Sequence, residues 1–303
     1  MTRILNASGC LDAVVAPDTA RALDAFVTKT VTPLPREGNA PARIAEVEHG
    51  MLNSIGLANP GIDCFLSTTL PPLAELGVPV WVSVGGFEVA DYAELCDRLD
   101  DRPEVAGIEL NVSCPNVDDV PASVGEIVAA ARVATRKPLY TKLSPATADV
   151  AEVARAAQAA GTDGLALVNT ILALALDERT LRPVLSRRAG GLSGPALKPI
   201  ALAAVFACYE ATGLPIVGMG GISSGRDALE FLAAGAEAVA LGTILFADPD
   251  APSRIRAELH REAEETAVGS PDNAVGLAHV EEPPGRLRGP LDTAFPSLKT
   301  TCK

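Results

Sequence analysis

Short apolar runs rich in valine, isoleucine and leucine alternate along the chain with longer, alanine-rich amphipathic segments. This alternation is typical of repeated βα units, in which parallel strands are buried on both faces and helices carry one apolar face. The predicted strands are residues 3–7, 25–29, 78–84, 106–112, 138–143, 163–169, 214–218 and 237–242. The predicted helices are residues 90–101, 122–136, 147–161, 196–212, 225–235 and 253–267, and several begin after Asp, Ser or Pro, which favour helix starts.

Eight regularly spaced strands fit either an open doubly wound sheet or a closed barrel. No GxGxxG motif follows the first strand, so the open dinucleotide-binding sheet is disfavoured. We therefore predict an α/β fold, a single (β/α)8 TIM barrel that spans residues 1–303 as one domain. The proline-rich tail, residues 268–303, is predicted to be an extended segment that wraps the domain, and not a second domain.

Composition narrows the class of protein. The chain has 303 residues, 48% of them hydrophobic, and 38 acidic against 25 basic residues give a net charge of -13. No Lys/Arg stripe is present, which argues against a nucleic-acid partner. The amino-terminal residues lack an apolar stretch of signal-peptide length, so we expect a cytoplasmic protein that does not associate with membranes. Six cysteines without a CxxC pair or clustered histidines predict neither a metal site nor a disulfide framework, and at least five of them are expected to be ordinary residues.

Polar side chains interrupt the apolar runs at the carboxyl ends of four predicted strands, where barrels carry their reactive groups. They are Lys29, Asn111, Lys142 and Asn169. One such residue is usually a loop cap or a solvated side chain. Four of them in phase around one barrel mouth indicate a binding site.

The last two strands end in Gly218-Met-Gly220-Gly221 and Leu241-Gly242-Thr243. Loops at these positions commonly hold a phosphate through backbone N–H groups, so a phosphorylated ligand is indicated. The alternative is that the glycines only permit tight βα turns.

The segment Asn111-Val-Ser-Cys114-Pro-Asn116 places a thiol directly after a central strand. A lone cysteine is usually structural. Its position between two asparagines at a strand end favours Cys114 as a residue that faces the ligand.

These motifs resemble the soluble class 1 dihydroorotate dehydrogenases, which bind FMN in a (β/α)8 barrel. The matching pieces are Asn6-Ala-Ser-Gly9, Thr28-Lys-Thr30, Gly50-Met-Leu-Asn-Ser-Ile-Gly-Leu57, Asn59-Pro-Gly61, Leu110 to Asn116, Lys142-Leu-Ser-Pro145, Asn169-Thr170, Gly190-Gly-Leu-Ser-Gly194, Gly218 to Ile222 and Gly242-Thr243. They run in order over almost the whole chain. The resemblance implies FMN-dependent oxidation of (S)-dihydroorotate to orotate in pyrimidine synthesis, with Cys114 as the base.

The stretch from Asn169 to Pro199 looks like the NAD-linked subtype, whose catalytic subunit works with a second subunit that carries FAD and a [2Fe-2S] cluster. Since this sequence has no cysteine cluster of its own, such a cluster would reside on the partner. The resemblance also leads us to expect a homodimer.

The resemblance assigns roles to individual residues. The implied FMN contacts are Ser8, Lys29, Thr30, Ser83, Asn111, Lys142, Val168, Gly194, Gly220, Gly221, Gly242 and Thr243. The implied substrate contacts are Lys29, Asn53, Ser54, Ile55, Gly56, Leu57, Asn111, Asn169 and Thr170. These residue types suit the chemistry, because asparagine pairs with the N–H and C=O edge of a pyrimidine and lysine attracts a carboxylate or a reduced flavin.

Three features depart from the family pattern. Relatives usually have some twenty residues before the first motif, which form a hairpin under the barrel. The loop after Cys114, residues 117–125, is shorter than in the subtype, and Ser83 stands where relatives often have Asn. Two alternatives therefore stay open: a flavin barrel that acts on another dihydropyrimidine, and a degenerate, non-catalytic flavin-binding subunit.

Overall fold

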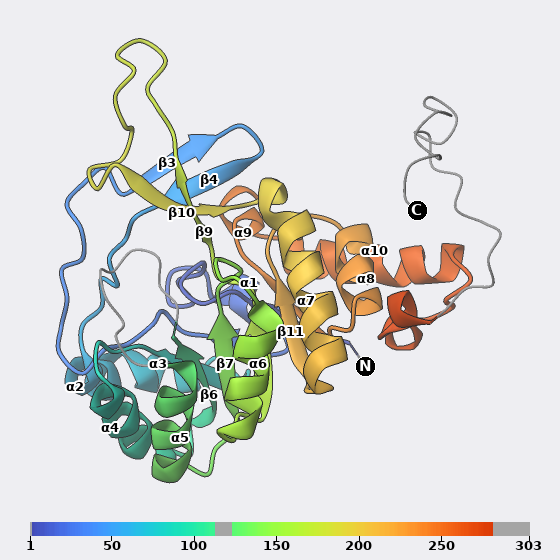
Figure 1. Ribbon diagram of the computed structural model, residues 1–303. Coiled ribbons are helices and arrows are strands. Elements are labelled where there is room, and N and C mark those ends of the chain that lie inside the picture. The colour runs from blue at the N-terminus through green and yellow to red at the C-terminus, as the bar shows by residue number, and fades with distance from the viewer. Residues whose placement is uncertain (1, 113–122, 281–303) are drawn as a thin grey trace, which may run out of the picture.

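The computed structural model describes residues 2–112 and 123–280. Eight parallel strands form its central sheet, in the order β1-β12-β11-β8-β7-β6-β5-β2 (Figure 1). Their bounds are β1 (Arg3–Asn6), β2 (Phe26–Val27), β5 (Val80–Val84), β6 (Val105–Asn111), β7 (Leu139–Leu143), β8 (Gly164–Leu167), β11 (Ile216–Met219) and β12 (Ala238–Leu241). A parallel bridge between Leu5 and Ala25 joins the two edge strands. The predicted (β/α)8 barrel is confirmed, and each of the eight predicted strands is present.

The seam between β1 and β2 is closed by a side chain as well as by backbone. The Asn6 side chain accepts a hydrogen bond from the Val27 N–H at 2.8 Å and donates one to the Val27 carbonyl at 2.7 Å. The amide of Asn6 thus pairs with β2 as a neighbouring peptide group would. This pairing explains how a strand of two residues completes the barrel.

The barrel strands bury different side chains on their two faces. In β12, Ala238 and Ala240 belong to the cluster inside the barrel, whereas Val239 and Leu241 belong to the larger cluster between strands and helices. This is the two-residue period of a strand with both faces covered. Small residues dominate the inner cluster, which leaves space along the barrel axis.

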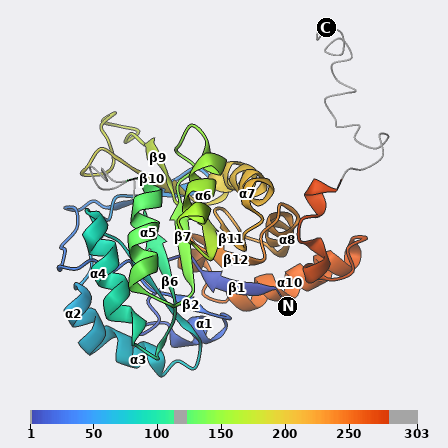
Figure 2. The same cartoon turned by 60° about the horizontal axis from the view of Figure 1, so that its bottom comes forward.

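Six long helices cover the outside of the strands, as predicted (Figures 1 and 2). They are α4 (Val89–Asp100), α5 (Val124–Ala134), α6 (Val150–Ala159), α7 (Lys198–Thr212), α8 (Gly225–Ala233) and α10 (Ala251–Glu265). Capping boxes start α4, α5 and α8, which satisfies orphan N–H groups at the helix starts. Among the described residues, no helix is both long and apolar enough to cross a membrane.

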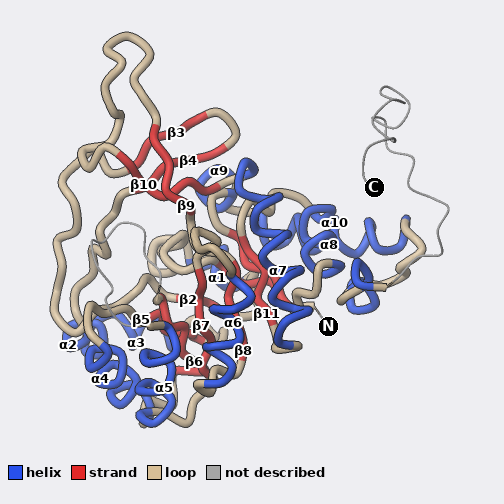
Figure 3. Tube along the Cα trace, viewed as in Figure 1, coloured by secondary structure: helices blue, strands red, loops and turns tan. Residues whose placement is uncertain are grey.

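The sequence did not predict a second, antiparallel sheet of four strands that stands above the carboxyl ends of the barrel (Figure 3). Its strands are β3 (Ile44–Val47), β4 (Gly50–Asn53), β9 (Ile171–Leu174) and β10 (Ala189–Ser193), in the order β3-β4-β10-β9. They come from the loops after β2 and β8. Two barrel loops far apart in sequence therefore pair into one lid-like layer over the mouth.

Short helices fill the remaining loops. They are α1 (Pro17–Arg21), α2 (Ile62–Cys64), the π-helix η1 (Phe65–Thr69), α3 (Leu70–Ala74), the 3₁₀-helix η2 (Pro195–Leu197), α9 (Ile244–Ala247), and the 3₁₀-helices η3 (Pro271–Ala274) and η4 (Leu277–His279). The described part of the tail thus contains two short helical turns that the sequence analysis did not foresee. Asp272 of η3 accepts a hydrogen bond from the Thr2 hydroxyl at 2.9 Å, which ties the tail to the start of β1.

Candidate active site

A cavity of about 270 Å³ lies between the carboxyl ends of the barrel strands and the antiparallel sheet. Most residues that the sequence predicted as ligand contacts line it together. They are Ser8, Lys29, Thr30, Asn53, Ile55, Gly56, Leu57, Asn111, Lys142, Val168, Asn169, Thr170, Gly194, Gly220, Gly221, Gly242 and Thr243. Side chains and loops from across the whole chain therefore converge on one site.

Two predicted contacts, Ser83 and Ser54, do not line this cavity, and a third predicted site residue is not described. Ser83 is fully buried behind Thr30, with the two hydroxyl oxygens 3.0 Å apart, so it supports a cavity residue instead of facing the ligand. Ser54 is turned toward Asn39, whose side-chain amide donates to the Ser54 hydroxyl at 3.0 Å. Cys114, the predicted base, lies outside the described residues.

A chain of hydrogen bonds crosses the mouth of the barrel. The Asn169 amide donates to Asn111 Oδ1 at 3.1 Å, and the Asn111 amide donates to Thr30 Oγ1 at 3.0 Å. Asn169 Oδ1 also accepts from the Thr170 N–H at 2.8 Å. These bonds fix the orientation of both asparagines at the mouth of the barrel.

Two lysines give the cavity a positive character. Lys142 is 6% exposed, and its ammonium donates to Ser8 Oγ at 3.0 Å and lies 3.6 Å from Glu109 Oε1. The Lys29 side chain packs over Gly9, where a Cβ would stand 2.8 Å from Lys29 Cδ. Gly9 has a φ of +77°, so glycine suits this position for both reasons. An anionic ligand is favoured between these two cations.

One end of the cavity is built from backbone. Gly220 and Gly221 have φ angles of +121° and +80°, and a Cβ at Gly221 would stand 2.7 Å from the Gly194 carbonyl oxygen. Across from them, the Thr243 hydroxyl donates to Ser193 Oγ at 2.8 Å. Successive backbone N–H groups in a turn can form a concave site that binds anions. The loops after β11 and β12 both line the cavity, and the phosphate site expected there stays a prediction.

Sequence reasoning missed several residues of this cavity. Met51, Ile44 and Ser193 come from the antiparallel sheet, which had no clear sequence signal, and Phe246 comes from α9. Cys10, which we expected to be ordinary, also lines the cavity. Burial raises the pKa of the Cys10 thiol although Lys142 and Lys29 oppose the shift, so this thiol stays protonated near neutrality and is a poor base.

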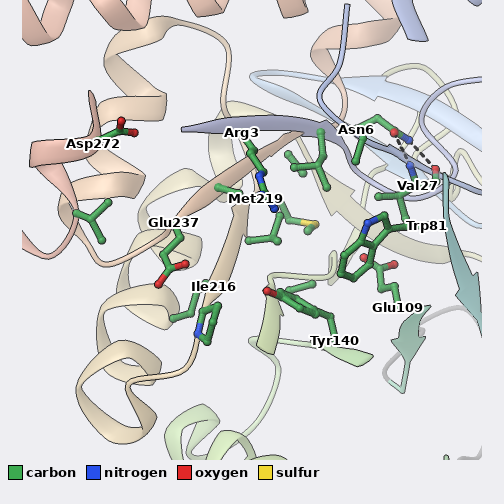
Figure 4. Close-up of a pocket in the computed structure, with 18 residues that line it drawn as sticks. Arg3, Asn6, Val27, Trp81, Glu109, Tyr140, Ile216, Met219, Glu237 and Asp272 are labelled. Carbon is green, nitrogen blue, oxygen red and sulfur yellow. Dashed lines mark hydrogen bonds between the residues drawn. The ribbon is translucent and has the colours of Figure 1, made fainter. Parts of the chain in front are cut away.

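A second cavity, of about 440 Å³, occupies the opposite end of the barrel, at the amino ends of the strands (Figure 4). Apolar side chains such as Leu5 and Val27 form much of its wall. The ionisable lining residues are Arg3, Glu109, Tyr140, Glu237 and Asp272. Met219, a member of the inner cluster, lines both cavities.

The fold is a (β/α)8 barrel, and lysines, asparagines and glycine-containing loops line a cavity at the carboxyl ends of its strands. The dihydroorotate dehydrogenase family matches residues 2–262. The catalytic subunit of dihydroorotate dehydrogenase B (NAD(+)) from Desulforudis audaxviator (strain MP104C) is 45% identical over 264 residues, 85% of this chain and 86% of that protein. A Solibacter usitatus (strain Ellin6076) protein, provisionally named dihydroorotate dehydrogenase A (fumarate), is 45% identical over 84% of this chain and 86% of its own length.

Solved structures agree on the fold. A crystal structure of DHODH from Eimeria tenella in complex with ferulenol superposes with a TM-score of 0.79, at 23% identity, over 92% of this chain and 86% of that one. The chain belongs to the dihydroorotate dehydrogenase family, a family of flavin-dependent oxidoreductases.

Proposed function

We propose that this protein oxidises (S)-dihydroorotate to orotate in pyrimidine synthesis, with FMN as its cofactor. The observation that carries the proposal is the convergence, in one cavity, of two lysines, two oriented asparagines and the glycine loops after β11 and β12. Such a set fits a flat polar acid beside a phosphate-bearing cofactor.

The described residues fit FMN at the glycine end and beside Lys142. A Cβ at Gly242 would meet only Ala7 and Cys10, at 3.6 and 3.8 Å, so the bare glycine leaves this side of the cavity open to a ligand group. The backbone at Gly220, Gly221, Gly242 and Thr243 would hold the phosphate, and the Lys142 ammonium would stabilise negative charge on the flavin. When bound, FMN supplies the hydride acceptor of the oxidation.

The chain's own groups would bind and deprotonate the substrate. Lys29 would pair with the substrate carboxylate, and Asn111 and Asn169 would hydrogen bond to the pyrimidine edge. Cys114 would remove the proton from C5 while the hydride leaves C6 for the cofactor. In the sequence, Cys114 follows the last residue of β6, Asn111, by three positions.

We propose that a partner subunit with FAD and a [2Fe-2S] cluster reoxidises the flavin. The name "catalytic subunit" of the Desulforudis audaxviator relative supports a partner of this kind. The fumarate-linked name of the Solibacter usitatus relative makes a soluble acceptor the competing proposal. Steady-state turnover with NAD+, measured with and without the co-expressed subunit, and with fumarate, separates the two.

Anaerobic addition of dihydroorotate to purified, FMN-saturated protein tests the proposed reaction. We expect the yellow colour to bleach as FMN is reduced, and orotate to form in equal amount. A yellow protein that stays oxidised with dihydroorotate but bleaches with another dihydropyrimidine would support the alternative substrate. A protein that binds no FMN would contradict the proposal.

A further inference from the structure

Glu109 is a buried carboxylate on β6 whose position the proposed chemistry does not yet explain. Its side chain is 5% exposed and lines the cavity at the amino ends of the strands, where Figure 4 shows it on the other side of the cavity from Glu237. Its Oε1 is buried and has no hydrogen-bond partner in the described structure. The same atom lies 3.6 Å from the ammonium of Lys142, a residue that lines the cavity at the carboxyl ends of the strands. Glu109 therefore approaches the active-site lysine from the cavity at the amino ends of the strands.

The energetics of this pair depend on burial. A buried carboxylate without a compensating charge is costly, and both side chains are almost fully buried, at 6% and 5% exposure. The distance of 3.6 Å is long for a hydrogen bond but short for a Coulomb interaction, which is strong away from water. Glu109 is thus placed to offset the charge of Lys142 without taking the place of Ser8, which accepts a hydrogen bond from the ammonium at 3.0 Å.

We propose that Glu109 is the counter-ion of Lys142, and that the pair, not the lysine alone, sets the charge that faces the bound flavin. This inference rests on the proposed FMN cofactor. Reduction adds negative charge to the flavin, so a neighbouring cation binds reduced FMN more tightly than oxidised FMN. A carboxylate behind that cation weakens this preference and keeps the bound flavin easier to reoxidise.

The test is the midpoint potential of bound FMN, which reports the ratio of affinities for reduced and oxidised cofactor. Glu109→Gln keeps the shape and removes the charge. We expect it to raise the preference for reduced FMN on the order of tenfold, because the lysine charge is no longer offset. Lys142→Met should shift the preference in the opposite direction.

Glu237→Gln is the matched control, since Glu237 lines the same cavity at the amino ends of the strands as Glu109 but is exposed. We expect its change in preference to stay within about twofold, because water and salt screen an exposed charge. If Glu109→Gln does not fold, Glu109→Asp moves the carboxylate back by one methylene and should raise the preference by a smaller factor.

The outcomes separate this inference from the proposed function. Wild-type protein that binds no FMN overturns both. Wild-type protein that binds FMN, with an unchanged or lowered preference for reduced FMN in the Glu109 variant, overturns only the role of Glu109. That role is overturned as well if Glu237→Gln shifts the preference as much as Glu109→Gln.

Discussion

The two ends of the barrel contain cavities of very different character, although one barrel contains both. At the carboxyl ends, asparagines, lysines and glycine loops meet under an added antiparallel sheet. At the amino ends, apolar side chains and a few ionisable groups surround a larger space. The carboxyl ends lead into the long loops after β2 and β8, which can be elaborated without disturbing the strands. The functional residues are therefore expected at that end, and substitutions there should change function more than substitutions at the other end, except at Glu109, which reaches Lys142.

The largest expected effect is that of Cys114→Ala. A positioned proton acceptor contributes roughly 10²- to 10⁴-fold, so the rate of flavin reduction by dihydroorotate should fall by this range near pH 7. The rate of flavin reduction in Cys114→Ser should fall similarly but recover in part as the pH rises, whereas the rate in Cys114→Ala should not recover. Anaerobic stopped-flow absorbance across pH measures this step. Cys64→Ser, at an exposed thiol, is the control, and wild-type reduction in Cys114→Ala would refute the assigned base.

Lys142→Ala should slow flavin reduction on the order of 10²-fold, because a preorganised positive charge is lost where negative charge develops. FMN retention should weaken as well. The reduction rate must be measured in flavin-saturated protein, so that lost cofactor is not counted as lost chemistry. Reduction kinetics that match the wild type would show that Lys142 serves only the packing around Ser8.

Asn169→Ala should weaken orotate binding by roughly 1–3 kcal/mol, because a buried polar edge of the ligand loses its partner. The hydrogen bond to Asn111 Oδ1 is lost too, so that side chain is no longer held in one orientation. Titration with orotate, followed by the change in flavin absorbance, gives the affinity. Wild-type affinity would mean that Asn169 only caps the end of its strand.

Gly221→Ala should reduce FMN affinity on the order of tenfold, because a left-handed residue that gains a side chain is strained by about 1–2 kcal/mol and the new Cβ also meets the Gly194 carbonyl. Gly213→Ala is the matched control. Gly213 also has a positive φ, of +61°, but a Cβ there meets nothing within 4 Å. The control should lose stability in thermal unfolding and keep its FMN affinity. Equal losses of affinity in both variants would contradict a specific role for the Gly221 loop.

The smallest effect is expected in the amino-end cavity at a residue other than Glu109. Tyr140→Phe removes a hydroxyl from a ring that packs edge-on against Trp81, with centroids 5.0 Å apart, and keeps the ring itself. Flavin reduction and orotate affinity should stay within about twofold of the wild type, as for most substitutions away from a functional site. A loss of orotate affinity comparable to that of Asn169→Ala would contradict the expected difference in function between the two cavities.

The sequence by itself determined the barrel and most of the mouth. Apolar runs located the eight strands, and a polar residue at a strand end must face the mouth once the strands close, because parallel strands present their carboxyl ends together. Lys142 and Asn169 were found in this way. The glycines after β11 and β12 were found because tight turns and close approach of the backbone to a ligand favour glycine, which is visible in the sequence.

Tertiary structure alone decided the rest. The antiparallel sheet joins β4 to β10, more than a hundred residues apart, and neither segment has the length or alternation that predicts a strand by itself. The same limit explains Ser83 and Glu109. Their strands were predicted, but strand position does not say which cavity, if any, a side chain reaches. Ser83 supports Thr30 from behind, and Glu109 acquires its significance only because barrel closure places its carboxylate 3.6 Å from the Lys142 ammonium.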